Sequence, residues 1–289
     1  MSALLDHPDS DIAYLGPKGS FAHLVALQRY PDAESRNDLK PFPTVPEVFE
    51  YVDRHQDARG IVPIENSSGG MIRVTVDEII EHAVHAACSV FIQEELSINV
   101  RLSLLGKRDR EIRVIYSHGA PLHHCEEYLK QHYPYAKKVE CTSTSVSAEQ
   151  ALDDPFGAAI APTISAEVFG LDILESNLLS EIENVTQFFV VGRNKLDPSA
   201  GKKTSLVVAL HDRPGSLVDF LLPWKNAGID LSRIESRPII GHPNTYRFLV
   251  EFKGTPQDAV IRSAMEEARA LAKNFYDMGS YPVLPRYES

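Results

Sequence analysis

The spacing of apolar residues along the chain switches repeatedly between the period of a strand and that of a helix, and this alternation limits the fold to α/β classes. Residues 12–15 predict a strand, residues 16–19 a glycine-rich turn, and residues 21–25 the start of an amphipathic helix. The same order returns with a strand predicted at 60–65 and a strongly periodic helix over 76–84. We therefore expect layered α/β structure from the start of the chain.

The middle of the chain repeats this organisation. Residues 89–105 predict one or two strands that cross between lobes, and a strand at 114–116 precedes a helix with Leu122, Cys125 and Leu129 on its inner face. Further strands are predicted near 137–141, 158–161 and 186–191. Residues 10–192 thus predict a two-lobed α/β region with a cleft, like that of periplasmic binding proteins.

The C-terminal part changes in character. Residues 193–203 are polar and rich in turn formers, which predicts a linker. Strands are then expected at 204–211, 229–240, 245–253 and 274–283, and helices at 215–227 and 256–272. This βαββαβ order predicts a small ferredoxin-like domain over 204–285. Pro223 falls inside the first of these helices, where it predicts a kink.

Charge and composition exclude several partners. The net charge of -11 argues against nucleic acid and anionic membranes, because both require a basic face. The N-terminus lacks a basic region followed by an apolar core, and the sequence has no run long enough to span a membrane. We expect a cytoplasmic protein.

Neither the cysteines nor any known cofactor motif indicates a binding site. Cys88, Cys125 and Cys141 have unrelated spacings, which favours small buried thiols over disulfides or a metal site. The sequence has no dinucleotide fingerprint, P-loop or nucleophile elbow. We therefore expect neither a cofactor nor a metal.

Several polar segments lie where α/β folds bind ligands. The turn Gly16-Pro-Lys-Gly-Ser20 and the triplet Ser143-Thr-Ser145 each precede a helix, whose free N–H groups favour a carboxylate. Glu65-Asn66-Ser67-Ser68 ends a predicted buried strand, the edge at which such sheets place ligand sites. The local sequence leaves a structural alternative for each segment, a strand-to-helix turn for the first and helix capping by Ser and Asn for the others.

Taken together in order and spacing, these segments and Asn184-Val-Thr-Gln-Phe188 resemble prephenate dehydratase. Gly215-Ser-Leu-Val218 and Glu235-Ser-Arg-Pro238 resemble the two phenylalanine-binding motifs of the ACT domain that ends this enzyme. The resemblance implies a lyase that decarboxylates and dehydrates prephenate to phenylpyruvate in phenylalanine biosynthesis. It also implies that phenylalanine controls the enzyme allosterically.

The resemblance also assigns roles to residues. It implies that the Thr186 hydroxyl helps protonate the departing ring oxygen, with Asn66 donating a hydrogen bond to the substrate. The full set of expected catalytic residues is Thr186, Asn66, Ser117 and His124. The expected substrate-binding residues are Ser20, Lys18, Glu65, Ser67, Ser143, Thr144, Ser145, Gln187 and Phe188.

Two positions depart from the family pattern. The family motif Thr-Arg-Phe reads Thr186-Gln187-Phe188 here, which removes a cation, and a site glutamine of the family is replaced by His124. Either the two changes compensate and dehydration survives, which we favour, or the chain is a prephenate decarboxylase that keeps the hydroxyl. A helix-surface role for His124 is also open, as is a third reading of the whole chain, a non-catalytic amino-acid-sensing binding protein.

The C-terminal motifs predict an effector site between two copies of the chain. The resemblance assigns effector binding to Gly215, Ser216, Leu217, Val218, Glu235, Ser236, Arg237 and Pro238. Since paired ACT domains bind the amino acid where they meet, we expect a homodimer or a dimer of dimers. Phenylalanine would then inhibit by shifting an equilibrium between conformers.

Overall fold

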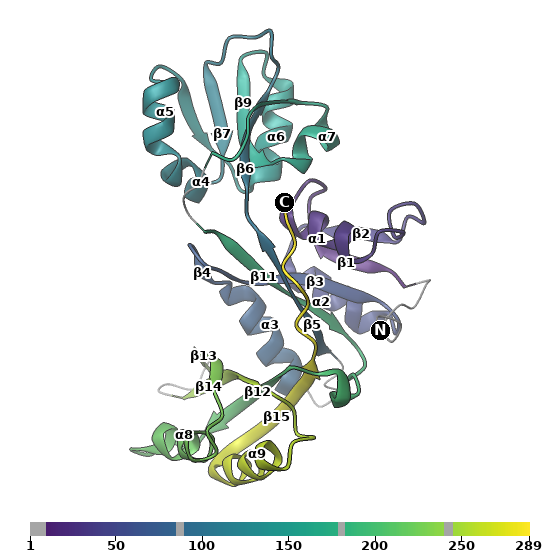
Figure 1. The fold of residues 1–289 in the computed structure, drawn as a ribbon, viewed down its shortest axis with the longest axis vertical. Helices are drawn as coiled ribbons and strands as arrows, with labels where there is room; N and C mark the ends of the chain where they lie inside the picture. Colours follow the sequence, from purple (N-terminus) through teal and green to yellow (C-terminus); the bar gives the residue numbers. More distant parts are fainter. Residues whose placement is uncertain (1–9, 85–89, 179–182, 240–244) are drawn as a thin grey trace.

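Three β-sheets, arranged in a row, organise the residues that the computed structural model describes, which are 10–84, 90–178, 183–239 and 245–289 (Figure 1). The sheet in the middle has the order β2-β1-β3-β11-β5, with β4 paired to β3. Its strands are β1 (Ile12–Leu15), β2 (Leu39–Phe42), β3 (Arg59–Asn66), β4 (Gly70–Met71), β5 (Phe91–Asn99) and β11 (Val185–Gly192). Its helices are α1 (Phe21–Arg29), α2 (Val45–Arg54) and α3 (Arg73–Val84).

This middle sheet, which we call the first sheet because it holds the first strands of the chain, is buried on both faces. Its central strands are apolar at nearly every position. Along β11, Phe188 and Val190 pack with the residues of α1, whereas Phe189 and Val191 pack with those of α2 and α3. Successive side chains of a strand point to opposite faces, so the two sets define the two sides of the sheet. We call them the α1 face and the α3 face.

The second sheet lies at the upper end of Figure 1 and has the order β10-β6-β9-β7-β8. Its strands are β6 (Leu102–Gly106), β7 (Val114–Ser117), β8 (Lys137–Glu140), β9 (Gly157–Pro162) and β10 (Asp172–Glu175). Its helices are α4 (Gly119–His124), α5 (Glu126–His132), α6 (Thr144–Asp153) and α7 (Ile164–Phe169). The chain enters this lobe between β5 and β6 and returns to the first sheet at β11, which gives the two-lobed arrangement predicted from the sequence.

The third sheet, at the lower end of Figure 1, has the order β13-β14-β12-β15, which is that of a ferredoxin-like fold. Its elements are β12 (Lys203–Leu210), α8 (Ser216–Asn226), β13 (Leu231–Pro238), β14 (Tyr246–Lys253), α9 (Ala259–Leu271) and β15 (Ala272–Tyr281), preceded by the 3-10 turn η1 (Pro198–Ala200). The predicted fold class is therefore confirmed. Helix α8 continues through Pro223 to Asn226.

The two faces of this C-terminal sheet have different partners. One face packs on α8 and α9 through a cluster that includes Phe220, Trp224 and Met265. From the other face, Leu249 and Tyr281 join the core on the α3 face of the first sheet. The C-terminal sheet and the first lobe thus share one hydrophobic core.

Several elements differ from the sequence expectations. The helix expected around residues 122–129 is two helices that meet at Cys125, and α2, α7, β2 and β10 had not been predicted. Cys125 and Cys141 are buried free thiols, whereas Cys88 and the expected strand ends at 89 and 240 lie outside the described residues.

No helix in the described part of the chain is long and apolar enough to cross a membrane. The same residues contain no group of three or more His, Cys, Asp or Glu side chains that could hold a metal ion.

Candidate active site

A hydrogen-bonded pair, Asn66 and Thr186, joins the ends of two neighbouring strands. The two residues are direct partners in the antiparallel register of β3 and β11. Asn66 Nδ2 donates to Thr186 Oγ1 at 2.9 Å and to Asn184 Oδ1 at 2.7 Å. The site is therefore built where the first sheet ends and the chain returns from the second lobe.

The orientation of the Asn66 amide follows from its other contacts. Its Oδ1 accepts hydrogen bonds from the backbone N–H groups of Ser68, at 3.0 Å, and Gly69, at 2.8 Å. Since only the oxygen can accept, the NH₂ group must face Thr186. Thr186 Oγ1 is then an acceptor toward Asn66, and among the described residues its own hydrogen has no recorded acceptor, so it can be donated to a ligand.

Thr186 lies in a largely dry environment. The residue is 8% exposed, and its side chain points to the α1 face of β11, the same side as the buried Phe188. Phe188 itself is part of the core on that face. A hydroxyl in such surroundings forms stronger hydrogen bonds to a ligand than it would in water.

Ser67 fastens the turn after β3 to β11. Its backbone N–H donates to Val185 O at 2.8 Å, and its Oγ accepts from Val185 N at 2.9 Å. These bonds hold the strand ends that carry Asn66 and Thr186 in register.

The turn after β1 is held together by its own polar groups. The Ser20 hydroxyl caps α1 by accepting from His23 N at 3.2 Å and donates to Leu15 O at 3.0 Å. Gly19 N donates to His23 Nδ1 at 3.1 Å, while Lys18 is exposed. Capping thus accounts for Ser20 structurally, and its role in binding stays a prediction.

The same turn contacts the second lobe. Ser165, in α7, donates from its Oγ to Gly19 O at 2.9 Å. Gly19 has a φ of +83°, and a Cβ placed there would lie 3.1 Å from Ser165 Oγ. The close approach of the two lobes therefore requires glycine at this position.

The predicted anion site of the second lobe lies at the start of α6. Ser143 caps this helix by accepting from Val146 N at 3.1 Å, Thr144 is half-buried, and Ser145 is fully buried. The first N–H groups of a helix have no acceptor within it, so those of Thr144 and Ser145 can meet a ligand. Within the described ranges, no hydrogen bond joins Ser143 to Asn66 or Thr186.

Two further predicted residues lie elsewhere in the second lobe. Ser117 is fully buried and donates to Ile160 O at 2.7 Å, so its hydrogen is engaged inside the sheet. His124 is half-buried at the end of α4, with its ring centroid 6.1 Å from that of His123.

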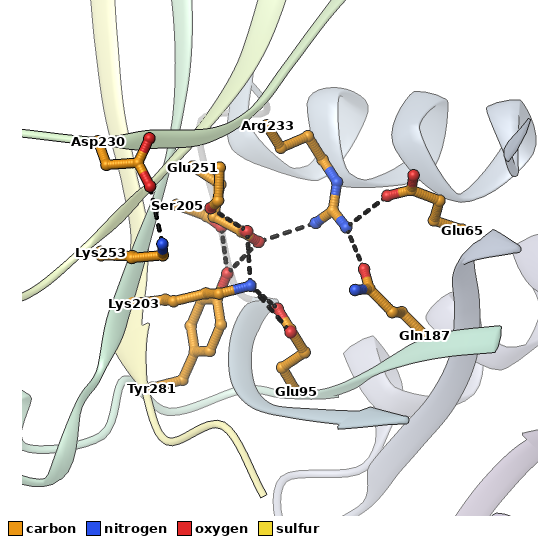
Figure 2. Close-up of polar contacts among 11 residues, drawn as sticks. Glu65, Glu95, Gln187, Lys203, Ser205, Asp230, Arg233, Glu251, Lys253 and Tyr281 are labelled. Atoms are coloured by element: carbon orange, nitrogen blue, oxygen red, sulfur yellow. Dashed lines mark hydrogen bonds and ion pairs between the residues drawn. The ribbon is translucent and has the colours of Figure 1, made fainter. Parts of the chain in front are cut away.

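Gln187 and Glu65 point away from Thr186. They are register partners on the α3 face, and both accept from one guanidinium, that of Arg233 in β13 (Figure 2). The Arg233 Nη2 atom lies 2.6 Å from Gln187 Oε1 and 3.0 Å from Glu65 Oε2. The change from Arg to Gln at position 187 therefore concerns the contact with the C-terminal sheet on the face opposite Thr186.

Sequence reasoning gave no role to three residues that organise this region. Asn184 begins the segment Asn184-Val-Thr-Gln-Phe188, which was identified by its resemblance to the family, but Asn184 itself was assigned no function. Ser165 and Arg233 had no local sequence signal, because each contacts a segment far away in sequence.

The C-terminal sheet has a pocket of about 260 Å³ at the start of α8. Gly215–Val218 line it together with Arg213 and Tyr246 among others. Gly215 has a φ of +83° and precedes the first helical residue. The segment Glu235–Pro238 lies on the edge strand β13 and does not line this pocket.

Fold and site together define a two-lobed α/β enzyme with a ferredoxin-like C-terminal sheet. Residues 12–196 match the family model of prephenate dehydratase. The bifunctional chorismate mutase/prephenate dehydratase of Stutzerimonas stutzeri is 33% identical over 94% of this chain and 73% of its own length. The chain belongs to the prephenate dehydratase family, and it is a carbon–oxygen lyase.

Solved structures that resemble most of the chain include the following two. Prephenate dehydratase from Arthrobacter aurescens, in complex with L-Phe, is 30% identical, covers 94% of this chain and 90% of its own, and has a TM-score of 0.83. The quorum quenching acylase GqqA is 24% identical, covers 95% and 98%, and has a TM-score of 0.82. The second likeness concerns the fold alone.

Proposed function

We propose that this chain decarboxylates and dehydrates prephenate to phenylpyruvate, with Thr186 donating its hydrogen bond to the departing hydroxyl. The observation that carries the proposal is the Asn66 amide, which donates to Thr186 Oγ1 at 2.9 Å, so that this bond does not use the hydroxyl hydrogen. Asn66 acts as the orienting donor behind the threonine.

The reaction needs few groups because aromatisation drives it. The bond between the ring and its carboxylate breaks, CO2 leaves, and the electron pair moves through the ring to expel the hydroxyl at C4, which takes up a proton and leaves as water. A hydrogen bond at that oxygen stabilises the charge that develops there. Alignment of the two breaking bonds supplies much of the remaining acceleration.

The substrate carries two carboxylates, and the proposal assigns one to each lobe. In the second lobe, the free N–H groups of Thr144 and Ser145 at the start of α6 favour an anion, with Ser143 beside them. In the first lobe, the exposed Lys18 and the turn ending at Ser20 are proposed for the other carboxylate.

The alternative of decarboxylation without loss of the hydroxyl depended on Gln187 and His124. The Gln187 side chain is bonded to Arg233 on the face of β11 opposite Thr186, so it does not replace a cation beside the leaving oxygen. We therefore retain dehydration as the function, and the catalytic roles expected for His124 and Ser117 stay predictions.

Product analysis tests the proposal. Incubation with prephenate should yield phenylpyruvate, followed by its ultraviolet absorbance, in a 1:1 ratio with released CO2. Release of CO2 without phenylpyruvate would establish the decarboxylase alternative, and binding without either product would establish a sensor.

The C-terminal unit is, in this proposal, an ACT domain that binds phenylalanine at Gly215–Val218. The pocket lined by these residues and the ferredoxin-like strand order support it. Because Glu235–Pro238 lies on the edge strand β13 outside that pocket, a second copy of the chain would supply this half of the site. The homodimer or dimer of dimers and the cytoplasmic location belong to the same proposal.

Sedimentation with and without phenylalanine tests the assembly. The proposal expects at least a dimer at micromolar concentration, with phenylalanine strengthening the association. A monomer that still binds phenylalanine would contradict the shared site.

A further inference from the structure

The guanidinium of Arg233 links the C-terminal sheet to the catalytic strands (Figure 2). Its Nη1 donates to Glu251 Oε2 at 2.8 Å, within the C-terminal sheet, and its Nη2 reaches Gln187 and Glu65 of the first lobe. The Arg233 side chain is 5% exposed and lies 5.4 Å from the Phe189 ring centroid. A planar donor with several fixed N–H directions holds such acceptors in a defined geometry.

Its anchor in the C-terminal sheet is rigid. Glu251 is 1% exposed and also accepts from Lys203 at 3.0 Å, from Tyr281 at 2.8 Å and from Ser232 at 2.5 Å. Lys203 in turn donates to Glu95 of β5 at 2.8 Å. The carboxylate that receives Nη1 is therefore fixed by three further donors.

The other end of the guanidinium binds strands β3 and β11 next to the Asn66–Thr186 pair. Gln187 and Glu65 face each other across β11 and β3, and the adjacent register pair is Thr186 with Asn66. Since side chains alternate along a strand, Arg233 binds from the α3 face while the Asn66–Thr186 bond lies on the α1 face. Arg233 therefore contacts the sequence neighbours of both members of the pair.

Position 187 is chemically matched to this arginine. Gln187 Oε1 is an acceptor for Nη2, whereas an arginine at the same place would have only donors and would add a second cation beside Arg233. The glutamine therefore completes a contact between the two units of the chain.

We propose that Arg233 is a positioning residue for the reaction, through which the C-terminal sheet sets the geometry of the Asn66–Thr186 pair. The inference rests on the proposed function, because Thr186 is the group whose position matters. Glu235–Pro238 continues the same strand β13, so a change at the effector site would reach the pair along this path.

The test compares Arg233→Met and Gln187→Met with Gln187→Glu, which keeps an acceptor. Both methionine variants should lower kcat about 10-fold or more while changing KM far less, because the pair acts at the leaving oxygen in the transition state. Gln187→Glu should lose clearly less kcat than Gln187→Met, because the acceptor for Arg233 is kept. Lys253→Met is the matched control, since Lys253 ends β14 and its exposed ion pair is with Asp230, just before β13, away from the first lobe.

Two comparisons separate positioning from a loss of folding. In a Thr186→Val background, Arg233→Met should cause no further loss of kcat, because there is no hydroxyl left to position. Amide hydrogen exchange of residues 183–190 should rise in both methionine variants and stay unchanged in Lys253→Met, a readout that needs no turnover.

The outcomes are distinct from those that bear on the proposed function. If wild-type enzyme forms phenylpyruvate but folded Arg233→Met and Gln187→Met keep its kcat, the positioning role is overturned while the function stands. If wild-type enzyme forms no phenylpyruvate, the proposed function fails. Independently of turnover, unchanged hydrogen exchange of residues 183–190 in the methionine variants would overturn the link from Arg233 to the strand ends.

Discussion

Asn66 Nδ2 lies 2.9 Å from Thr186 Oγ1, and the direction of this hydrogen bond is set by the two backbone N–H groups that bind Asn66 Oδ1. The relationship makes Thr186 an acceptor on one side and a free donor on the other. The chemistry proposed for the chain follows from that direction.

Replacing Asn66 with Asp should reverse this bond. The carboxylate can only accept, so the Thr186 hydrogen would turn toward it and away from the substrate, and the oxygen that replaces Nδ2 would also face Asn184 Oδ1. We expect kcat with prephenate to fall about 100-fold, within the usual range for proton-transfer groups. Asn274→Asp on the exposed surface is the control, and an equal loss in both variants would point to a charge effect instead.

Replacing Gly19 with Ala should weaken the contact between the lobes. Its φ of +83° costs an alanine about 1–2 kcal/mol, and the new Cβ would also press on Ser165 Oγ at 3.1 Å. Gly170→Ala supplies the control, because that glycine has a φ of +63° and nothing within 4 Å of a Cβ. Urea unfolding should show a larger loss for Gly19→Ala, and equal losses would mean that the lobe contact adds nothing.

His23 should make the fold sensitive to mild acid. Burial lowers the pKa of His23 below its ordinary 6.5, with Glu34 opposing and Lys18 reinforcing the shift, and its Nδ1 must stay unprotonated to accept from Gly19 N. Below pH 6.5 the unfolded chain binds a proton that the folded chain does not, so stability is full above pH 6.5 and declines as the pH falls toward the folded pKa.

The slope in that window is at most about 1.4 kcal/mol per pH unit for one group. Denaturant unfolding between pH 7.5 and 5.5 should show a flatter pH dependence for His23→Gln than for wild type, whereas the exposed His132→Gln should leave it unchanged. Identical slopes in all three proteins would remove His23 as the cause.

A bulky residue at Gly215 should weaken phenylalanine inhibition. The glycine lines the pocket at the start of α8 with a φ of +83°, so Gly215→Val would distort the turn that offers its N–H groups to the ligand. We expect the phenylalanine concentration for half inhibition to rise about 10-fold or more while activity without effector is kept. Gly228→Val, at another positive φ with open space around it, is the control, and unchanged inhibition in Gly215→Val would contradict the site.

Local pattern was sufficient for much of the fold. The apolar runs of β3 and β11 and the order of elements after residue 203 could be predicted, because each depends on a short segment. The missed helix α2 also had a local signal, since Thr44 caps it by accepting from Glu47 N and the segment Thr44–Glu47 matches a capping box.

The contacts that organise the site could not be predicted in the same way. The Arg233–Gln187 bond depends on how the C-terminal sheet docks on the first sheet, and the Ser165–Gly19 bond on how the lobes close. The apolar periodicity of a single strand or helix does not predict such contacts between distant parts of the chain. The sequence departure at residue 187 was visible, but its partner across 46 positions was not.

The central claim is that the Thr186 hydroxyl assists the loss of the ring oxygen, and the most direct measurement is kcat for phenylpyruvate formation by Thr186→Val and Thr186→Ser. Valine keeps the shape without the hydroxyl, so kcat should fall about 100-fold or more, whereas serine keeps the donor and should stay within about 10-fold of wild type. A folded Thr186→Val enzyme with wild-type kcat would contradict the account.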